Sequence, residues 1–313
     1  MGVERRHALM RAVLNRDPAE RPGPDEEDLP AVRVSAGRIV AVSPHRIVLE
    51  NAAGTEERLV VAPWATAWRG TEVKPSELPV GAHAIARLIP QGGAVERIWA
   101  DVTRLTGTIL HVSGDRDLTL DLDCGPHRGR RTVTVPYRVS GRIRVRHPKL
   151  EPGYLFDAIG VLEQGEPIAY LPATSQPPYR AGATPAPPYE YGPAQATISG
   201  TAVWSDGLPE DAAGVAYPML ERADTGCAEA GRSCAGLPYL ALGSRLRVRN
   251  VCTHRSCVLP VVACGCMAGH FCDRCVECDT SLRGRIVEVT PTSFAGLGGE
   301  LTKGCFIVKI GLE

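Results

Sequence analysis

The residues of this sequence with the most potential chemistry are its cysteines, ten of which fall in the C-terminal third of the chain. An even, dense set of cysteines in a small β domain is typical of disulfides formed in an oxidising compartment. Each bridge contributes about 2–4 kcal/mol of stability. We therefore expect disulfides among the following residues: Cys227, Cys234, Cys252, Cys257, Cys264, Cys266, Cys272, Cys275, Cys278 and Cys305. Cys124 stands far from these ten and is expected to have no partner.

Zinc is the alternative chemistry for the same cysteines. A zinc site could use the spacing Cys264-x-Cys266-x5-Cys272-x2-Cys275-x2-Cys278, with His254 and His270 near in sequence. Its Cys-x2-Cys steps could place two thiolates on one tetrahedral ion. A reducing compartment would favour that interpretation. An iron–sulfur cluster is not favoured, because the ferredoxin pattern also requires a fourth cysteine before a proline. We expect no cofactor, with zinc as the alternative.

Composition indicates many short strands rather than long helices. The chain has 313 residues, enough for two or three domains, with 33 Gly, 26 Pro and only 5% aromatic residues. The 35 basic and 35 acidic residues balance, so net charge favours neither nucleic acid nor an anionic membrane as partner. No apolar run reaches the roughly 18 residues that a transmembrane segment needs.

Residues 1–30 are expected to form a short helix, over Glu4–Asn15, followed by a flexible arm rich in proline and charge. They lack the apolar core of roughly 7–15 residues that a secretory signal requires. The sequence therefore predicts no signal peptide here, which leaves a cytoplasmic location open.

A repeat follows the arm. The segment Gly37–Arg46 matches Gly107–Arg116 at an offset of 70 residues, and the turn Leu78–Gly81 matches Leu150–Gly153. Repeated strands between Gly, Pro and Asp turns predict small barrels of about five strands, similar to OB-like folds. We expect two tandem copies with the same strand order and no helix, at 31–101 and 102–171. Such barrels bind oligonucleotides or sugars, or serve as scaffolds, and the scaffold role is favoured here.

A basic stretch occupies the second copy. Its arginines are Arg128, Arg130, Arg131, Arg138, Arg142, Arg144 and Arg146. A surface that binds nucleic acid interleaves basic residues with aromatics, and Tyr137 is the only aromatic among these. We interpret the stretch as a solvated face. The lone histidines, including His147, are expected at the surface or in turns.

Residues 172–195 are rich in proline and are expected to form an extended linker that holds the last domain away from the barrels. Residues 196–313 then carry a more specific signal, in three parts: the opening strand Gly200-Thr-Ala-Val-Trp204, the Leu237–Val248 segment, and an ending made of Ile286–Thr290, Ser293–Ala295 and Gly304–Ile310. This region resembles the double-psi β-barrel of rare lipoprotein A, expansin and barwin. The resemblance implies a groove that engages cell-wall polysaccharide.

In that family an Asp after the middle strand is the general acid. Two alignments place this position differently. Continuity of the strand puts it on Ala263, whereas an Asp-Arg-Cys-x-x-Cys motif puts it on Asp273, after an inserted loop. The family's His before Leu-Pro is replaced by Cys234, and the Asp of its last Ile-Asp-Leu-Ser strand by Glu288. No catalytic residue is assigned; Asp273 and Glu288 are the candidates.

The resemblance also places Trp204, Asp206 and Glu288 along the groove. Together, these expectations predict a non-catalytic, disulfide-stapled protein of a cell wall or cell surface. Its predicted partner is a polysaccharide or a surface protein. The alternatives are a peptidoglycan lytic transglycosylase or glycosidase that uses Asp273 or Glu288, and a zinc-stapled intracellular interaction module. An extracellular or cell-surface location follows from the family and the cysteine content. The sequence does not specify the ligand or the oligomeric state.

Overall fold

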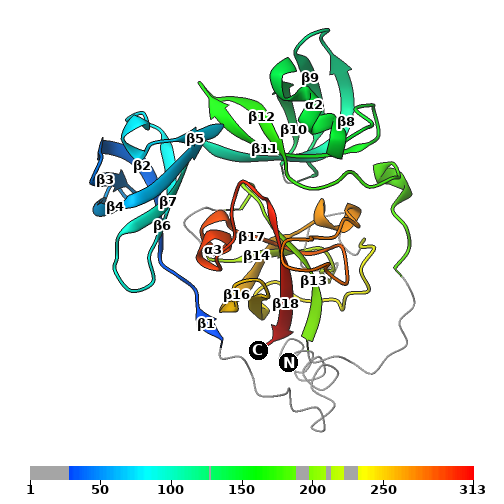
Figure 1. Ribbon diagram of the computed structural model, residues 1–313. Coiled ribbons are helices and arrows are strands. Elements are labelled where there is room, and N and C mark those ends of the chain that lie inside the picture. Colours follow the sequence, from blue (N-terminus) through cyan, green and yellow to red (C-terminus); the bar gives the residue numbers. More distant parts are fainter. Residues whose placement is uncertain (1–27, 127, 188–196, 209–212, 222–231) are drawn as a thin grey trace.

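The computed structural model describes residues 28–126, 128–187, 197–208, 213–221 and 232–313. Over these residues the chain consists mainly of strands that form three barrels (Figure 1). The expectation of an all-β chain with two small barrels and a cysteine-rich barrel is therefore confirmed. The predicted helix at Glu4–Asn15 and Cys227 both lie outside the described residues. Within the described ranges, no helix is long and apolar enough to cross a membrane.

The first barrel is a ring of five strands with a sixth attached to it. Its elements are β2 (Val34–Ser43), β3 (Arg46–Glu50), β4 (Glu56–Arg69), β5 (Thr71–Val73), η1 (Pro75–Glu77), β6 (His83–Leu88) and β7 (Val95–Ala100). The ring has the order β3-β2-β6-β7-β4 and closes where β3 pairs with β4, while β5 extends the end of β4 as a hairpin. Only β4 and β7 pair in parallel among these strands.

The second barrel has the same topology. Its elements are β8 (Val102–Ser113), β9 (Leu118–Asp123), β10 (Arg130–Val135), α2 (Tyr137–Arg146), β11 (Leu155–Glu163) and β12 (Glu166–Pro172). The ring order β10-β12-β11-β8-β9 is that of the first barrel, with β10 and β12 parallel. Period-2 alternation in β9 points Leu118, Leu120 and Leu122 into the core.

The backbone explains why the repeat was visible in the sequence. A Cβ on Gly37 would lie 2.4 Å from the carbonyl oxygen of Glu50, and a Cβ on Gly107 would lie 2.7 Å from that of Asp123. The first strand of each barrel bulges two to four residues later, and the φ angles of Gly81 and Gly153 are 93° and 88°. Only glycine satisfies these close approaches and positive φ angles without strain. The same local requirement recurs 70 to 72 residues apart.

The expectation that neither copy contains a helix is wrong for the second. The helix α2 occupies the place that the short η1 turn holds in the first barrel. It starts after Pro136 and buries Ile143 against the barrel. Its ten residues include Gly141 and no acidic residue in the first turn, so the usual sequence signals for the start of a helix are missing.

The third barrel is a ring of six strands. Its elements are β13 (Thr197–Trp204), β14 (Val215–Tyr217), β15 (Arg245–Asn250), β16 (Arg255–Cys264), η4 (Ala268–His270), β17 (Arg285–Val289), α3 (Pro291–Gly296) and β18 (Cys305–Leu312). The ring has the order β16-β14-β17-β13-β18-β15 and closes between β15 and β16. Two of its pairs are parallel, β13 with β17 and β14 with β16. A short strand before the first barrel, β1 (Leu29–Pro30), pairs with the start of β16.

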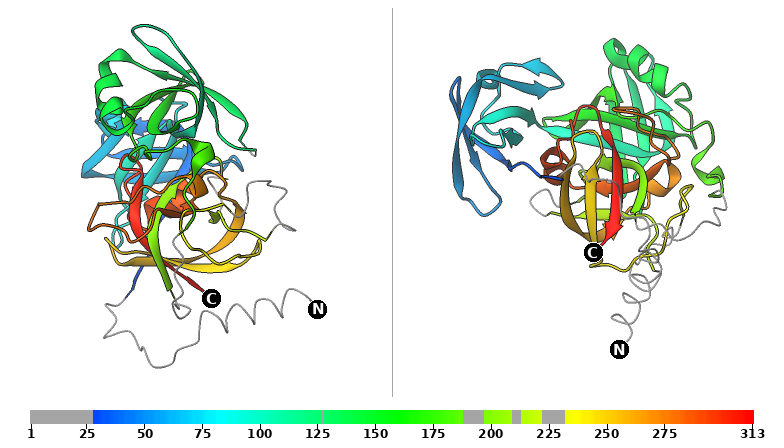
Figure 2. Two further views of the ribbon diagram at one scale, coloured as in Figure 1. Left: turned by 90° about the vertical axis from the view of Figure 1, so that its right-hand side faces the viewer. Right: turned by 60° about the horizontal axis from the view of Figure 1, so that its bottom comes forward.

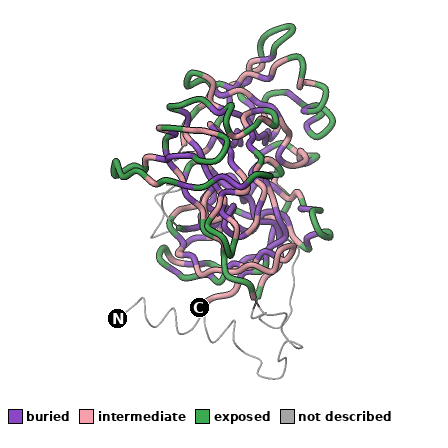
Figure 3. Tube along the Cα trace, turned by 60° about the vertical axis from the view of Figure 1, so that its left-hand side comes forward, coloured by how far each residue is buried: buried purple, intermediate pink, exposed green. Residues whose placement is uncertain are grey.

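The barrels are packed directly on one another. One continuous hydrophobic cluster contains Trp99 of the first barrel, Ile159 of the second and Trp204 of the third. Figure 2 shows the second barrel stacked on the third, and Figure 3 shows buried segments running through the centre of the molecule. The expectation of a linker that holds the last domain away is wrong for its described part: Tyr179 donates to the carbonyl of His270 at 2.9 Å and accepts from the amide of Cys272 at 3.1 Å.

Candidate functional site

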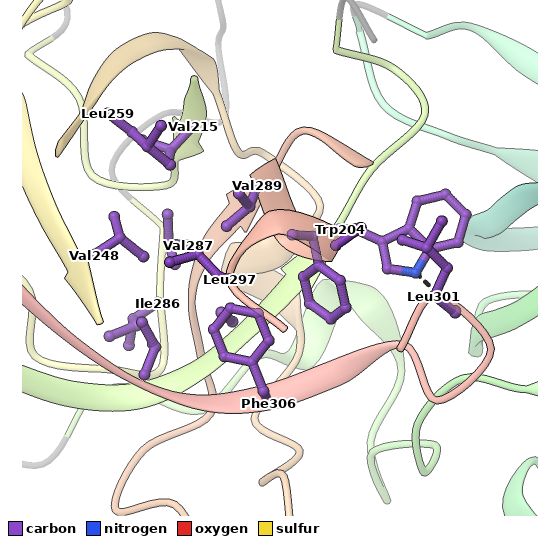
Figure 4. Close-up of a cluster of buried hydrophobic side chains, with 14 of the residues drawn as sticks. Trp204, Val215, Val248, Leu259, Ile286, Val287, Val289, Leu297, Leu301 and Phe306 are labelled. Atoms are coloured by element: carbon purple, nitrogen blue, oxygen red, sulfur yellow. Dashed lines mark hydrogen bonds between the residues drawn. The ribbon is translucent and has the colours of Figure 1, made fainter. Parts of the chain in front are cut away.

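Trp204 lies in the core of the third barrel rather than along a groove. Its side chain has no exposed surface, and its indole nitrogen donates to the carbonyl oxygen of Leu301 at 2.9 Å (Figure 4). Phe306, Val287 and Leu297 belong to the same cluster. In this position Trp204 stabilises the fold and has no face to offer a sugar.

Asp273 is buried and ion-paired. Its carboxylate is 5% exposed and accepts from Nε of Arg285 at 3.1 Å. Burial raises the pKa of Asp273, and the charge of Arg285 opposes that rise. The other carboxylate oxygen of Asp273 is buried without a hydrogen-bond partner among the described residues. A general acid must come within hydrogen-bond reach of the leaving oxygen, and Asp273 has no solvent-facing side from which to do so.

Arg285 connects Asp273 to a larger buried charge network at the junction of the second and third barrels. The guanidinium of Arg285 also binds Asp157 of β11, which accepts from Arg104 of β8 at 3.0 and 2.7 Å. The hydroxyls of Thr106 and Thr174 also donate hydrogen bonds to the carboxylate of Asp157, at 2.8 and 2.7 Å. All four charged side chains of this network are at most 5% exposed.

The network fixes the protonation states around Asp157. Burial alone would raise the pKa of Asp157, but the charges of Arg104 and Arg285 hold it well below its usual range. His147, expected at the surface, is fully buried instead and accepts the backbone amide of Asp157 through Nε2 at 3.1 Å. Burial lowers the pKa of His147 to about 4, so its ring is neutral at pH 7 and can accept that hydrogen bond.

Glu288, the second candidate acid, is also sequestered. Its side chain is 2% exposed and accepts from Nη2 of Arg128 at 2.7 Å. Arg128 belongs to the turn between β9 and β10 of the second barrel, so the second barrel covers this part of the third. Glu288 raises the pKa of Arg128, against the effect of burial, and Arg128 remains charged.

Asp206 makes a third connection between these two barrels. It accepts from Arg131 at 3.1 Å, from the amide of Arg104 at 3.3 Å, and from the hydroxyl of Thr103. The interpretation of the arginine stretch as a solvated face is therefore wrong for Arg128 and Arg131, which point toward the third barrel. Sequence reasoning singled out Asp206, Asp273 and Glu288 but did not pair them with the arginines that neutralise them.

The cysteines pair across different parts of the third barrel. Cys234 is bonded to Cys272, with Cα atoms 5.9 Å apart, and Cys252 to Cys278, with Cα atoms 5.4 Å apart. Cys266 also forms a disulfide. Its Sγ lies 2.7 Å from the Sγ of Cys264, which remains a thiol. The thiols of Cys275 and Cys305 contact each other, which lowers the pKa of Cys275 and raises that of Cys305. The expectation of disulfides therefore fits the bonded pairs, but not Cys257, Cys275 or Cys305, which form no disulfide among the described residues.

Like Cys275 and Cys305, Cys124 and Cys257 form no disulfide in the described part of the chain. Burial raises the pKa of Cys124 and that of Cys257 to about 11. No group of three or more His, Cys, Asp or Glu side chains in the described ranges is arranged to hold a metal ion.

The raised pKa predicts slow alkylation of Cys124 in the folded protein. The rise from 9.0 to about 11 lowers the thiolate fraction about 100-fold at neutral pH, and Cys124 is only 7% exposed. We expect iodoacetamide to label Cys124 at least about 100-fold more slowly in the native protein than in guanidinium chloride, as measured by peptide mass mapping. Equal rates in the two states would contradict the buried position.

A groove separates the first and third barrels on the side of α3. Its volume is about 730 Å³. The apolar side chains Val34, Leu49 and Leu259 and the polar side chains Thr55 and Glu56 contribute to its walls. This groove differs from the one expected from the sequence, because it needs residues of the first barrel that no motif had marked.

No family model matches the chain, and no curated protein matches it.

Proposed function

We propose that this chain is a non-catalytic binding protein of a cell surface or cell wall, in which the third barrel is of the double-psi type found in rare lipoprotein A and expansins. Six strands in a closed ring, two parallel strand pairs and the helix α3 before β18 support that assignment. The two preceding barrels are OB-like, with five-stranded rings of identical order. Disulfides in the third barrel favour an extracellular or surface location.

The observation that carries this proposal is the burial and pairing of both candidate acids. Asp273 pairs with Arg285, and Glu288 with Arg128, and neither carboxylate is more than 5% exposed. Hydrolysis or transglycosylation requires an acid that can reach the glycosidic oxygen. A glycosidase that uses either residue would first have to separate the second barrel from the third.

The groove between the first and third barrels is the binding site we propose for polysaccharide. Its mixed apolar and polar lining suits a sugar ring, which presents apolar faces and a rim of hydroxyls. Thr55 on the turn before β4 and Glu56 at the start of β4 are exposed and can accept or donate hydrogen bonds there. A protein partner is the alternative occupant of this groove.

The zinc-stapled alternative is not favoured. Cys272 and Cys278 are bonded to different cysteines, and Cys275 contacts Cys305 instead of either neighbour. The three cysteines of the Cys-x2-Cys-x2-Cys motif therefore contact three different cysteines. This is typical of disulfide cross-links rather than of one tetrahedral zinc site.

The first test is for activity. We expect no release of muropeptides from purified sacculi by the wild-type chain, and the same result for Asp273→Asn, because Asp273 has no access to substrate. Release by the wild type that disappears in Asp273→Asn would overturn the non-catalytic proposal in favour of a lytic enzyme.

The second test is for binding. We expect wild-type protein to co-sediment with sacculi, and Thr55→Arg to weaken that binding at least about 10-fold, because the larger side chain enters the groove. Thr71→Arg is the matched control, since Thr71 is an exposed residue of β5 outside the groove. Saturable binding that both variants retain equally would exclude this groove. No binding by the wild type would move the proposal to a protein partner.

A further inference from the structure

The helix α2 of the second barrel carries an unusual concentration of positive charge. Between Cys124 and Leu150 the chain has seven Arg and one Lys but no Asp or Glu. Arg128 and Arg131 face the third barrel, as described above. The remaining arginines of this stretch include four in α2, all of them exposed: Arg138, Arg142, Arg144 and Arg146. A zero net charge for the whole chain thus conceals a strongly basic surface.

The helix gains little internal stability from these charges. Arg138, Arg142 and Arg146 follow one another at i, i+4 spacing, where like charges repel by about 0.2–0.5 kcal/mol per pair. Its first turn has no acidic residue to complement the dipole. Arg138 donates to the hydroxyl of Tyr170 and Arg146 to that of Ser175, while Arg142 and Arg144 make no hydrogen bond or ion pair with any residue that the structure describes. Such a charge pattern is best explained by an anionic partner outside the chain.

The arrangement of the arginines indicates what kind of partner this is. Ile143 anchors the buried side of the helix, so Tyr137, Gly141 and Val145, spaced by four, lie along the outermost line. Tyr137 is 63% exposed and Val145 is 79% exposed. Two arginines, Arg138 and Arg142, flank this line on one side, and Arg144 flanks it on the other. An apolar outer line between arginines is typical of a helix that lies in the headgroup region of a membrane.

Nucleic acid fits these features less well. A surface that binds single-stranded nucleic acid needs several aromatic side chains on which bases can stack, and Tyr137 is the only aromatic residue of α2. An exposed valine between Arg144 and Arg146 gains nothing from a phosphate backbone but is stabilised by contact with the acyl boundary of a bilayer. Two acidic groups of the described residues lie beside this face: Asp117 accepts the backbone amide of Tyr137, and Glu163 accepts from the hydroxyl of Tyr170.

We infer that α2 docks the protein peripherally on an anionic lipid surface, with Tyr137 and Val145 against the bilayer and the arginines on lipid phosphates. Guanidinium groups suit this role because they bind phosphate oxygens in pairs. The helix is held rigidly on the barrel through Ile143, so the surface is preformed. This inference is independent of the groove proposed for polysaccharide, which lies on the first and third barrels.

Vesicle co-sedimentation tests the inference with the full chain. We expect partitioning onto phosphatidylcholine vesicles that contain about 30 mol% phosphatidylglycerol, and much weaker partitioning onto phosphatidylcholine alone, at about 0.1 M salt. Removing two arginines with Arg142→Gln and Arg144→Gln should lower the partition coefficient about 30-fold, at about 1 kcal/mol per arginine. The control is Arg46→Gln with Arg58→Gln, which removes the same net charge from exposed positions of the first barrel.

A second variant separates docking from general charge attraction. Val145→Trp adds interfacial apolar surface at a position that the fold leaves exposed, and should raise the partition coefficient several-fold without altering thermal unfolding. Equal partitioning of the α2 double variant and its control would overturn the inference. Saturable binding of an oligothymidylate probe at the same salt, with no preference for anionic vesicles, would also overturn it and indicate nucleic acid instead.

Discussion

The Asp157→Asn variant should lose about 3–5 kcal/mol of unfolding free energy. The substitution is nearly isosteric but removes the carboxylate that Arg104 and Arg285 share at the junction of the second and third barrels. Breaking a buried ion pair leaves an uncompensated charge in a region of low dielectric, and that penalty is of this magnitude. Urea denaturation followed by circular dichroism measures the loss directly.

Asp115→Asn is the matched control for Asp157→Asn, because Asp115 is an exposed residue of the same barrel. Its expected effect is within about 0.5 kcal/mol. If Asp157→Asn were no more destabilising than Asp115→Asn, the buried charges would contribute nothing to the stability of the interface between the two barrels. Their packing would then rest on the hydrophobic cluster alone.

The stability of the protein should fall as the pH is lowered from about 6.5 to about 4, in part because of His147. Burial lowers the pKa of His147 in the folded state to about 4, below the ordinary histidine pKa of 6.5 that applies to the unfolded chain. Between these values the unfolded state binds more protons, so the stabilising contribution of neutral His147 is complete above about pH 6.5 and lost as the pH falls through this window. A shift of this size corresponds to about 3 kcal/mol.

Comparison with His147→Gln isolates this contribution. Glutamine can still accept the amide of Asp157 but does not titrate, so the difference in unfolding free energy between wild type and variant should shrink by about 3 kcal/mol between about pH 7.5 and pH 4. Denaturant titrations at a series of pH values measure that difference. Parallel stability curves for the two proteins would show that His147 titrates normally in the fold.

The parts of the fold that could be predicted from sequence depend on local requirements. Gly37 and Gly107 recur because the same close backbone approach needs glycine in each barrel. The cysteine pairs followed from the number and density of cysteines, although their connectivity did not. Strand alternation in β9 likewise appears directly in the order of its residues.

The candidate site could not be predicted in the same way, because its geometry is a tertiary property. Arg104 and Asp157 are 53 residues apart, and Asp157 and Arg285 are 128 apart. No spacing rule connects them. Trp204 shows a different limit: a shift of one residue in strand register exchanges the core for the surface, and an aromatic residue in an opening strand fits either face.

Net charge does not show how charges are distributed, for a related reason. The balance of 35 basic and 35 acidic residues favoured no anionic partner, but the charges are segregated along the chain. Arg128 and Arg131 form ion pairs with carboxylates of the third barrel, whereas Arg142 and Arg144 are exposed to solvent. Only the fold separates these two groups.

The pairing of β1 with β16 has a consequence for the order in which the molecule is made. The guanidinium of Arg255 donates to the carbonyl of Pro30, a contact that spans 225 residues. On the ribosome, the first two barrels can close from strands that are near in sequence, since domains generally fold as units from the N-terminus. The strand β1 can dock only after β16 of the third barrel has been synthesised. It therefore joins the beginning of the described chain to a strand that emerges much later, after both small barrels.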